Sequence, residues 1–305
     1  MPTRRFASLV FALSLAACDS RSTADAGGSG TDAGGGGADA GVGALPNTLG
    51  PSERPAQLVS PPGYDSAQTY PVVVLLHGYS ASGSAQNSYL GFDRATRAAG
   101  VFGIIPDGTV DASGNHFWNA TPACCNFNGS TVDDVAYLRG LVEELETYAQ
   151  ISDVYFFGHS NGGFMSYRMA CEWADRVSGI ASLAGSDFFS ETDCVPSQPV
   201  SVLQIHGDMD ATIPYDGVAL GYPSAPDVVL RWADRASCDT AAGTMGTPVD
   251  FETNLAGAET TPLDYETGCA GAEASLWTIE GGSHIPTVNR EFTPAVIDWL
   301  IAHAR

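Results

Sequence analysis

Basic residues are scarce in this chain of 305 residues. Lysine and arginine together number 13, against 35 aspartates and glutamates, which gives a formal net charge of −22 and a sequence pI near 4.3. A surface so poor in positive charge is unsuited to following a phosphate backbone, so we exclude nucleic acid as a partner. Solubility is a sufficient reason for the acidity, and it implies no preference for cationic substrates.

Long apolar runs are also lacking. The run from Phe6 to Ala17 follows Arg4 and Arg5 and is too short to span a bilayer, so it predicts a signal peptide over residues 1–17. It ends in small residues leading into Cys18, as at the cleavage site of bacterial lipoproteins, where the cysteine is acylated. The alternative is an ordinary secretory signal with an incidental cysteine. We expect an exported protein, either lipid-anchored to a bacterial membrane or secreted.

Residues 18–45 are expected to hold the acylated cysteine and a flexible linker. From Asp19 to about Ala44 the chain is almost only Gly, Ala, Asp, Ser and Thr, which offer too little apolar area to offset the entropy of ordering. Residues 46–305 have the length and apolar content of one large domain. The lipid would be its only contact with a membrane, and we expect a monomer.

No C-x-x-C spacing occurs, which argues against zinc, and we expect no metal site. The cysteines other than Cys18 are even in number, which in an exported chain predicts disulfides. Cys238 and Cys269 flank one polar segment and are expected to pair, and the other four would then pair among themselves. These four are Cys124, Cys125, Cys171 and Cys194.

Short β-branched or aromatic runs alternate with helical patterns along the domain. Strands are expected over 72–76, 101–105, 154–157, 179–183, 200–205 and 276–279. Helices are expected over 135–148, with Ser130 or Thr131 as the cap, directly after Ser160, over 227–236 and over 293–304. This alternation of strands and helices predicts an α/β fold with a doubly wound, mostly parallel sheet.

The motif Gly158-His159-Ser160-Asn161-Gly162-Gly163 stands between a predicted strand and a predicted helix. G-x-S-x-G in that context is typical of a nucleophile elbow, whose glycines allow the strained turn that exposes the serine. Acyl transfer by a serine needs a base, an acid that orients the base, and donors for the oxyanion. Such chemistry requires no cofactor.

Chain order and strand ends select the partners of Ser160. In α/β hydrolases the acid and then the base follow the serine, at the carboxyl ends of later strands. His284 is the preferred base, and Asp210 is favoured as the acid, with Asp208 and Asp187 as rivals. The other histidines are less suitable as the base. His77 and His206 end strands, His116 precedes the serine, and His303 lies on the last helix. His159 is next to Ser160 and should point away from it.

The oxyanion hole is expected to consist of the backbone N–H groups of Tyr79 and Asn161. The loop over residues 107–128 is long and unpatterned and should form one wall of an acyl pocket. Tyr79, Trp118 and Ile285 are the residues predicted to contact substrate.

These motifs together resemble the bacterial polyhydroxybutyrate depolymerase and feruloyl esterase-like family of secreted α/β-hydrolase serine esterases. The matching segments are 76–78, 117–120, 124–125, 132–135, 158–165, 205–207 with Asp210, and 281–284, within about 55–302. The resemblance implies an α/β-hydrolase fold, with Ser160 as nucleophile, Asp210 as acid and His284 as base. It also implies bridges from Cys171 and Cys194 to Cys124 and Cys125, in either connectivity.

The resemblance implies an ester substrate: a polyhydroxyalkanoate, a hydroxycinnamoyl ester or a small synthetic ester. Many relatives have an aromatic residue soon after the histidine, where this chain has Ile285, and polymer-degrading relatives often append an adsorbing domain after the hydrolase. We therefore expect small, aryl or oligomeric esters rather than solid polymer. The alternatives are a non-catalytic surface lipoprotein that binds ligands on the same fold, and a peptidase.

Overall fold

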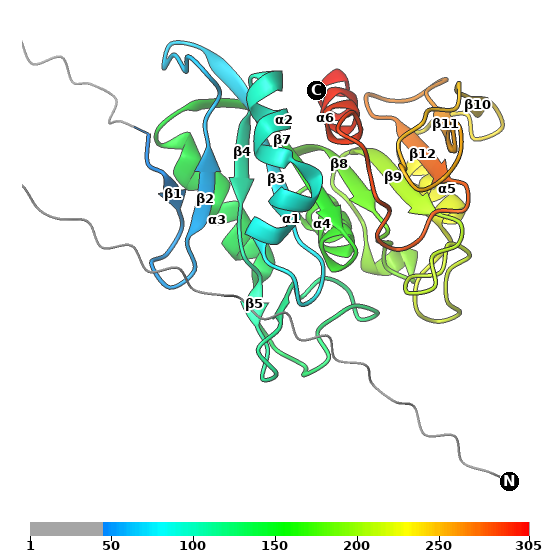
Figure 1. Cartoon of the computed structure of the whole chain (residues 1–305), viewed down its shortest axis with the longest axis horizontal. Helices are drawn as coiled ribbons and strands as arrows, with labels where there is room; N and C mark the ends of the chain where they lie inside the picture. The colour runs from blue at the N-terminus through cyan, green and yellow to red at the C-terminus, as the bar shows by residue number, and fades with distance from the viewer. Residues whose placement is uncertain (1–44, 305) are drawn as a thin grey trace, which may run out of the picture. The chain divides into compact units, whose positions relative to one another are not determined.

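The computed structural model describes residues 45–304, which form one compact unit. The signal peptide expected over 1–17, Cys18 and the linker up to residue 44 lie outside the described residues. The described chain is built on a ten-stranded sheet in the order β1-β2-β4-β3-β7-β8-β9-β12-β11-β10 (Figure 1).

The centre of the sheet is parallel and its two edges are antiparallel. The parallel strands are β4 (Phe102–Ile105), β3 (Thr69–Leu76), β7 (Gln150–His159), β8 (Val177–Leu183), β9 (Ser201–Gly207) and β12 (Ala274–Ile279). They correspond to the strands predicted from apolar runs, as expected for strands buried on both faces. The edges are β1 (Thr48–Leu49) and β2 (Ala56–Val59) on one side, and β11 (Thr260–Tyr265) and β10 (Thr244–Met245) on the other.

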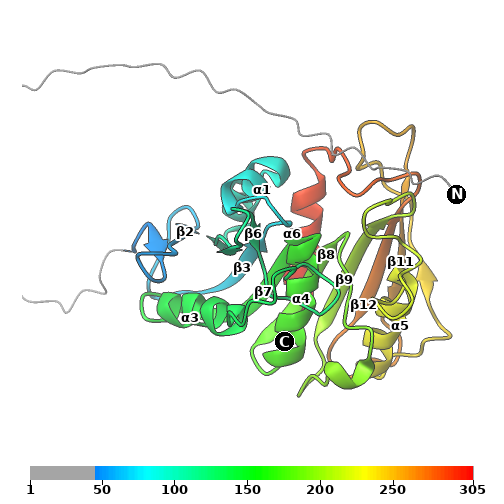
Figure 2. The same cartoon turned by 90° about the horizontal axis from the view of Figure 1, so that it is seen from below.

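Helices cover both faces of the sheet. One face carries α1 (Gly83–Leu90), α2 (Phe92–Ala99) and α6 (Phe292–Ala302), and the other carries α3 (Asp134–Glu146), α4 (Asn161–Glu172) and α5 (Ala225–Arg235) (Figures 1 and 2). Side chains of β3 alternate between the two cores: Val72 and Val74 face one, Val73 and Leu75 the other. The fold is therefore the doubly wound α/β-hydrolase fold predicted from the sequence, in a single domain.

Some elements were not predictable from apolar patterns. α1 and the antiparallel edge strands have no sustained apolar period, α2 is amphipathic but only 8 residues long, and the loop over 107–128 contains a small hairpin of β5 (Thr109–Val110) and β6 (His116–Phe117). A short 3₁₀ helix spans Glu191–Asp193. The predicted cap of α3 is wrong: Asp133, not Ser130 or Thr131, accepts the N–H of Ala136 at 2.9 Å.

The disulfides are Cys124–Cys125, Cys171–Cys194 and Cys238–Cys269. The pairing of Cys238 with Cys269 is as predicted. The bridges expected from Cys171 and Cys194 to Cys124 and Cys125 are wrong, because the end of α4 brings Cys171 next to Cys194, with their Cα atoms 5.1 Å apart. No helix within residues 45–304 combines the length and apolar character needed to cross a membrane.

Candidate active site

Ser160 occupies a sharp turn between β7 and α4. Its backbone has φ 55° and ψ −119°, a conformation that residues other than glycine rarely adopt. The turn also brings backbone into close approach at two glycines: a Cβ atom on Gly158 would collide with the carbonyl of Gly162, and one on Gly162 with the carbonyl of Leu76. The motif therefore adopts the strained strand-turn-helix geometry of a nucleophile elbow.

The structure brings Ser160, His284 and Asp210 into one hydrogen-bonded chain. Ser160 Oγ lies 2.9 Å from His284 Nε2, and His284 Nδ1 lies 2.7 Å from Asp210 Oδ2. A carboxylate only accepts hydrogen bonds, so Nδ1 carries the imidazole proton. The lone pair of Nε2 is then free to accept the hydroxyl proton of Ser160. The arrangement can activate the hydroxyl as a nucleophile.

The carboxylate of Asp210 is buried and held by several donors. Its Oδ1 accepts the N–H groups of Thr212 and Ile213 at 2.8 and 2.9 Å, and its Oδ2 lies 3.3 Å from His206 Nε2. Burial opposes ionisation, but the hydrogen bonds from His206, His284 and Ile213 outweigh it and hold the pKa of Asp210 well below its ordinary value. Asp210 is thus a fixed anion behind His284.

The two rival aspartates serve elsewhere. Asp208 Oδ1 accepts the N–H of Gly281 at 2.6 Å and so closes a turn. Asp187 is fully buried, and its Oδ2 accepts from Trp232 Nε1 and Arg235 Nη1, each at 3.0 Å. Burial raises the pKa of Asp187 despite the guanidinium. Neither carboxylate is hydrogen-bonded to His284 in the described chain.

His77 has the hydrogen-bonding duty expected of a histidine at a strand end. Its Nδ1–H donates to the carbonyl of Gly78, and its Nε2 accepts the N–H of Gly108, both at 2.8 Å. Burial lowers the pKa of His77 to about 4, so the ring is neutral.

His159 was predicted to point away from Ser160, but the two residues line the same cavity. The loop that carries His284 packs against the end of β7, so His159 Nε2–H donates to the backbone carbonyl of His284 at 2.9 Å. The two rings lie 5.2 Å apart, and burial lowers the pKa of His159 to about 4. His159 thus stays neutral and holds the backbone of His284.

Two backbone N–H groups flank the nucleophile. Tyr79 follows Gly78 in the loop after β3, and Asn161 is the first residue of α4. Within residues 45–304, neither N–H donates to a backbone or side-chain acceptor. The N–H of Ser160, in contrast, donates to the carbonyl of Leu183 at 2.8 Å. A helix N-terminus also carries partial positive charge. The pair can therefore stabilise an oxyanion beside Ser160.

A cavity of about 610 Å³ opens onto Ser160. Its walls are largely apolar, and the loop over 107–128 forms one of them, as predicted. The rings of Tyr79 and Phe127 meet edge to face with centroids 5.1 Å apart, while Phe127 and Ile285 are 70% and 61% exposed. The wall also includes Phe127, Ile213 and Tyr222, which the sequence did not single out, and Cys124 and Cys125, which were expected only as disulfide partners.

The prediction that Trp118 contacts substrate is wrong. Its ring has no exposed surface and does not line the cavity. Instead Trp118 Nε1 donates to the carbonyl of His77 at 3.0 Å, and the guanidinium of Arg54 lies 5.3 Å from the ring. An aromatic residue in an unpatterned loop gives no sign of which way it points. Tyr79 and Ile285 do line the cavity.

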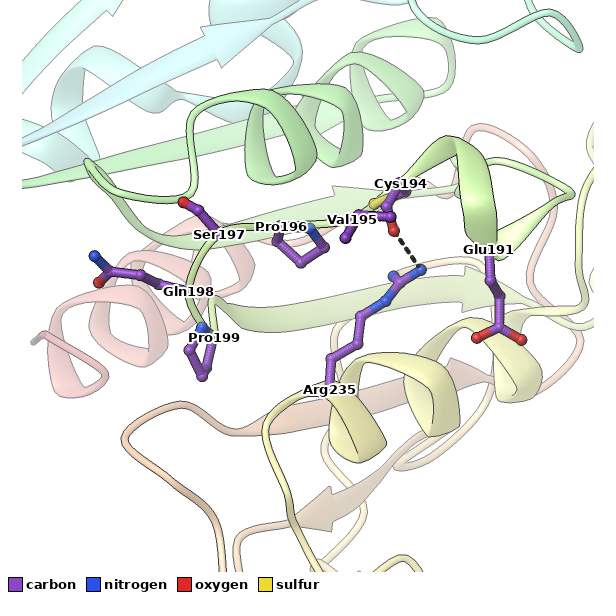
Figure 3. A pocket seen from close by; sticks show the side chains of 8 residues that line it. All are labelled: Glu191, Cys194, Val195, Pro196, Ser197, Gln198, Pro199 and Arg235. Carbon is purple, nitrogen blue, oxygen red and sulfur yellow. Dashed lines mark hydrogen bonds between the residues drawn. The ribbon is translucent and has the colours of Figure 1, made fainter.

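A second hollow, of about 330 Å³, lies beside Cys194 and α5 (Figure 3). Val195, Pro196 and Pro199 form part of its wall, and Arg235 Nη2 donates to the carbonyl of Cys194 at 3.1 Å. The guanidinium is already engaged, and no histidine lines this hollow. It therefore lacks the serine–histidine pair that is present at Ser160.

His77, Asp107 and His116 place potential ligand atoms within 4.8 Å of one another. Each group has a structural partner: His77 Nε2 accepts the N–H of Gly108, Asp107 Oδ1 accepts the N–H of Gly83 at 2.7 Å, and His116 Nδ1 donates to the carbonyl of Gly108 at 2.9 Å. These hydrogen bonds make the cluster a support for the loop.

No protein-family model matches the chain. Over 160 residues it is 31% identical to NocK of Nocardia uniformis subsp. tsuyamanensis, which carries the name of an esterase, covering 52% of this chain and 45% of NocK. It is 25% identical to feruloyl esterase B of Piromyces equi over 239 residues, covering 73% of this chain and 41% of that enzyme. The chain thus spans less than half the length of these curated relatives.

Among solved structures, the acetyl xylan esterase of Aspergillus awamori superposes with a TM-score of 0.58 at 16% identity. The match covers 84% of this chain and 96% of that one, and it shows the shared fold. The expected resemblance to feruloyl esterase-like α/β hydrolases is confirmed by these relatives.

Proposed function

We propose that this chain is a carboxylic ester hydrolase that acts through a covalent acyl-enzyme on Ser160. The observation that carries the proposal is the hydrogen-bonded chain from Ser160 through His284 to the buried Asp210, which opens onto a cavity large enough for a small ester. The esterase names of the relatives support the same class of reaction.

In the proposed mechanism, Ser160 Oγ attacks the ester carbonyl while His284 Nε2 takes its proton. The charge that develops on the carbonyl oxygen is accepted by the N–H groups of Tyr79 and Asn161, each worth about 3 kcal/mol in the transition state. His284 returns the proton to the leaving alcohol. Water then attacks the acyl-enzyme while His284 takes its proton, and His284 returns that proton to Ser160 Oγ as the acid is released.

The lining of the cavity supports an apolar or aromatic acyl group. Tyr79, Phe127 and Tyr222 present rings, and the Cys124–Cys125 disulfide adds a sulfur surface. We infer hydroxycinnamoyl or other aryl esters first, then short-chain esters and polyhydroxyalkanoate-type oligomers. The names of the feruloyl esterase relatives support the first choice.

We further infer that the protein works outside the cytoplasm. Three disulfides in the described chain suit an oxidising compartment. Residues 1–17 have the pattern of a signal peptide and Cys18 that of a lipidation site, so we propose that a lipid on Cys18 anchors the domain 46–305 through a flexible linker.

Labelling with a fluorophosphonate and turnover of p-nitrophenyl butyrate test the reaction. Ser160→Ala should abolish both, whereas Ser283→Ala, an exposed serine beside His284, should leave both unchanged. A panel of methyl ferulate, 3-hydroxybutyrate oligomers, short aliphatic esters and peptides then ranks the substrates. Absent labelling of the wild-type protein, or unchanged turnover in Ser160→Ala, would contradict the proposed function.

A further inference from the structure

The two oxyanion donors belong to different elements. The ladder between β3 and β7 keeps them together as far as the pair Leu76 and Gly158. Beyond that pair the ladder ends, although the two chains stay packed: a Cβ on Gly78 would lie 3.4 Å from Ser160 Cβ. One chain continues to Tyr79 in a loop, the other to Asn161 at the start of α4. The hydrogen bonds of the sheet therefore end before the two N–H groups, whose spacing and direction depend on further hydrogen bonds.

The segment 116–118 provides that connection. On one side, the carbonyl of His116 accepts the N–H of Ser80 at 2.8 Å, and Trp118 Nε1 donates to the carbonyl of His77 at 3.0 Å, so the loop around Tyr79 is held before and after it. On the other side, the backbone of Trp118 is paired with the side chain of Asn161.

The pairing between Trp118 and Asn161 is reciprocal. The N–H of Trp118 donates to Asn161 Oδ1 at 2.7 Å, and Asn161 Nδ2 donates to the carbonyl of Trp118 at 3.0 Å. Both residues are fully buried. Two hydrogen bonds in opposite directions fix both the distance and the orientation between Trp118 and Asn161. Losing them would leave buried polar groups of both residues without hydrogen-bond partners.

We propose that the side chains of Asn161 and Trp118 are positioning residues that set the spacing and direction of the oxyanion donors Tyr79 and Asn161. This inference rests on the proposed function. Asn161 thus acts twice: its backbone N–H faces the oxyanion, and its carboxamide holds the segment that supports the other donor. Trp118 acts through its indole N–H and backbone, without touching substrate.

The expected consequence is selective for the transition state. Oxyanion donors stabilise charge only when they lie about 2.7–3.1 Å from the developing oxyanion. A carbonyl in the ground state depends less on them, so a change in their spacing lowers kcat more than it changes KM. A merely structural contact would instead lower the fraction of folded protein and leave kcat per folded molecule unchanged.

The test uses Asn161→Ala and Trp118→Phe, which removes the indole N–H together with part of a fully buried ring. Active sites are titrated with fluorophosphonate, and kcat is expressed per titrated site. Because complete loss of one donor costs 10²–10³-fold, we expect a loss of roughly 10- to 100-fold in kcat for Asn161→Ala, with KM within about twofold, and a smaller loss for Trp118→Phe. Affinity for a trifluoromethyl ketone, whose adduct with Ser160 carries the oxyanion, should fall in parallel with kcat/KM.

Asn119→Ala is the matched control. Asn119 lies in the same loop and its side chain also makes two hydrogen bonds, to the carbonyl of Val132 at 2.8 Å and from Asn126 at 3.0 Å, but none to the elbow. It should retain wild-type kcat per site. An equal loss in Asn119→Ala would mean that general loosening of the loop is the cause, and would overturn the inference.

Wild-type kcat per site and ketone affinity in Asn161→Ala would also overturn the inference while leaving the proposed function intact. If Asn161→Ala does not fold, Trp118→Phe decides by the same readouts. A wild-type protein that neither reacts with fluorophosphonate nor turns over esters would overturn the proposed function, and with it this inference.

Discussion

Replacing Asp210 with asparagine tests the proposed roles most directly, because the two side chains have nearly the same shape. The N–H groups of Thr212 and Ile213 point at Oδ1 of Asp210 and require an acceptor there. In Asp210→Asn the amide oxygen therefore takes that place, and the amide NH₂ faces His284 Nδ1 and His206 Nε2.

An NH₂ group cannot accept the Nδ1–H of His284. The imidazole must then move its proton to Nε2, where it faces Ser160 Oγ and can no longer take the hydroxyl proton. The corresponding replacement in a serine protease lowers kcat about 10⁴-fold, so we expect about 5 kcal/mol of lost transition-state stabilisation here. Burial of Asp210 leaves no room for water to replace the carboxylate.

The assay is kcat with p-nitrophenyl butyrate at pH 7.5 or so, with folding checked by circular dichroism. Asp208→Asn is the matched control, since Asp208 is two residues away and its carboxylate accepts only the N–H of Gly281 among the described residues. It should retain nearly full kcat. An Asp210→Asn enzyme with more than about a tenth of wild-type kcat would refute the proposed orientation of His284, because a reversed imidazole permits no such rate.

Three further predictions concern stability. Replacing both Cys171 and Cys194 with serine should lower the free energy of unfolding by about 3 kcal/mol, since the bridge closes a separation of 23 residues; an unchanged urea midpoint would contradict this. Because the pKa values of buried His77 and His159 are about 4 against an ordinary 6.5, only the unfolded chain gains these two protons between pH 6.5 and 4, so each histidine should lower stability by about 3 kcal/mol towards pH 4; His159→Gln should remove about half of that fall in urea titrations, and an unchanged pH profile would contradict it. Arg54→Leu should cost about 3–5 kcal/mol, because it leaves buried Asp134 without its partner at 2.8 Å; calorimetry showing an unchanged melting temperature would refute it.

The parallel centre of the fold is predictable because its strands are apolar on both faces. In β3 the stretch over 72–76, with the sequence VVVLL, is buried at every residue and is one apolar run. β11, over Thr260–Tyr265, pairs on one side with β12 and on the other with only two residues of β10, and its sequence TTPLDY lacks such a run. α1 is similar: its sequence GSAQNSYL has few apolar residues, and its start is marked by Ser82, whose side chain accepts the N–H of Ala85. Edge elements of this kind depend on tertiary partners.

The site was predictable where strand ends carry it and unpredictable where loops do. Ser160, Asp210 and His284 follow predicted strands, so chain order alone places them at one edge of the sheet. Trp118 and the cysteine pairs depend on how loops pack, and neighbouring positions such as Cys124 and Cys125 can pair with each other as well as with distant partners. Sequence patterns carry no information about such choices until the loop path is known.

The position of His284 illustrates the remaining gap. Its loop follows β12, which is separated from β7 by β8 and β9, so three spacings of about 4.8 Å lie between the strands that precede His284 and Ser160. The loop must therefore return across the edge of the sheet. The bond from His159 to the carbonyl of His284 and the 2.6 Å bond from Tyr89 to the carbonyl of Pro286 hold it there. His159 is adjacent to the nucleophile in sequence, so the elbow both carries Ser160 and anchors the base that activates it.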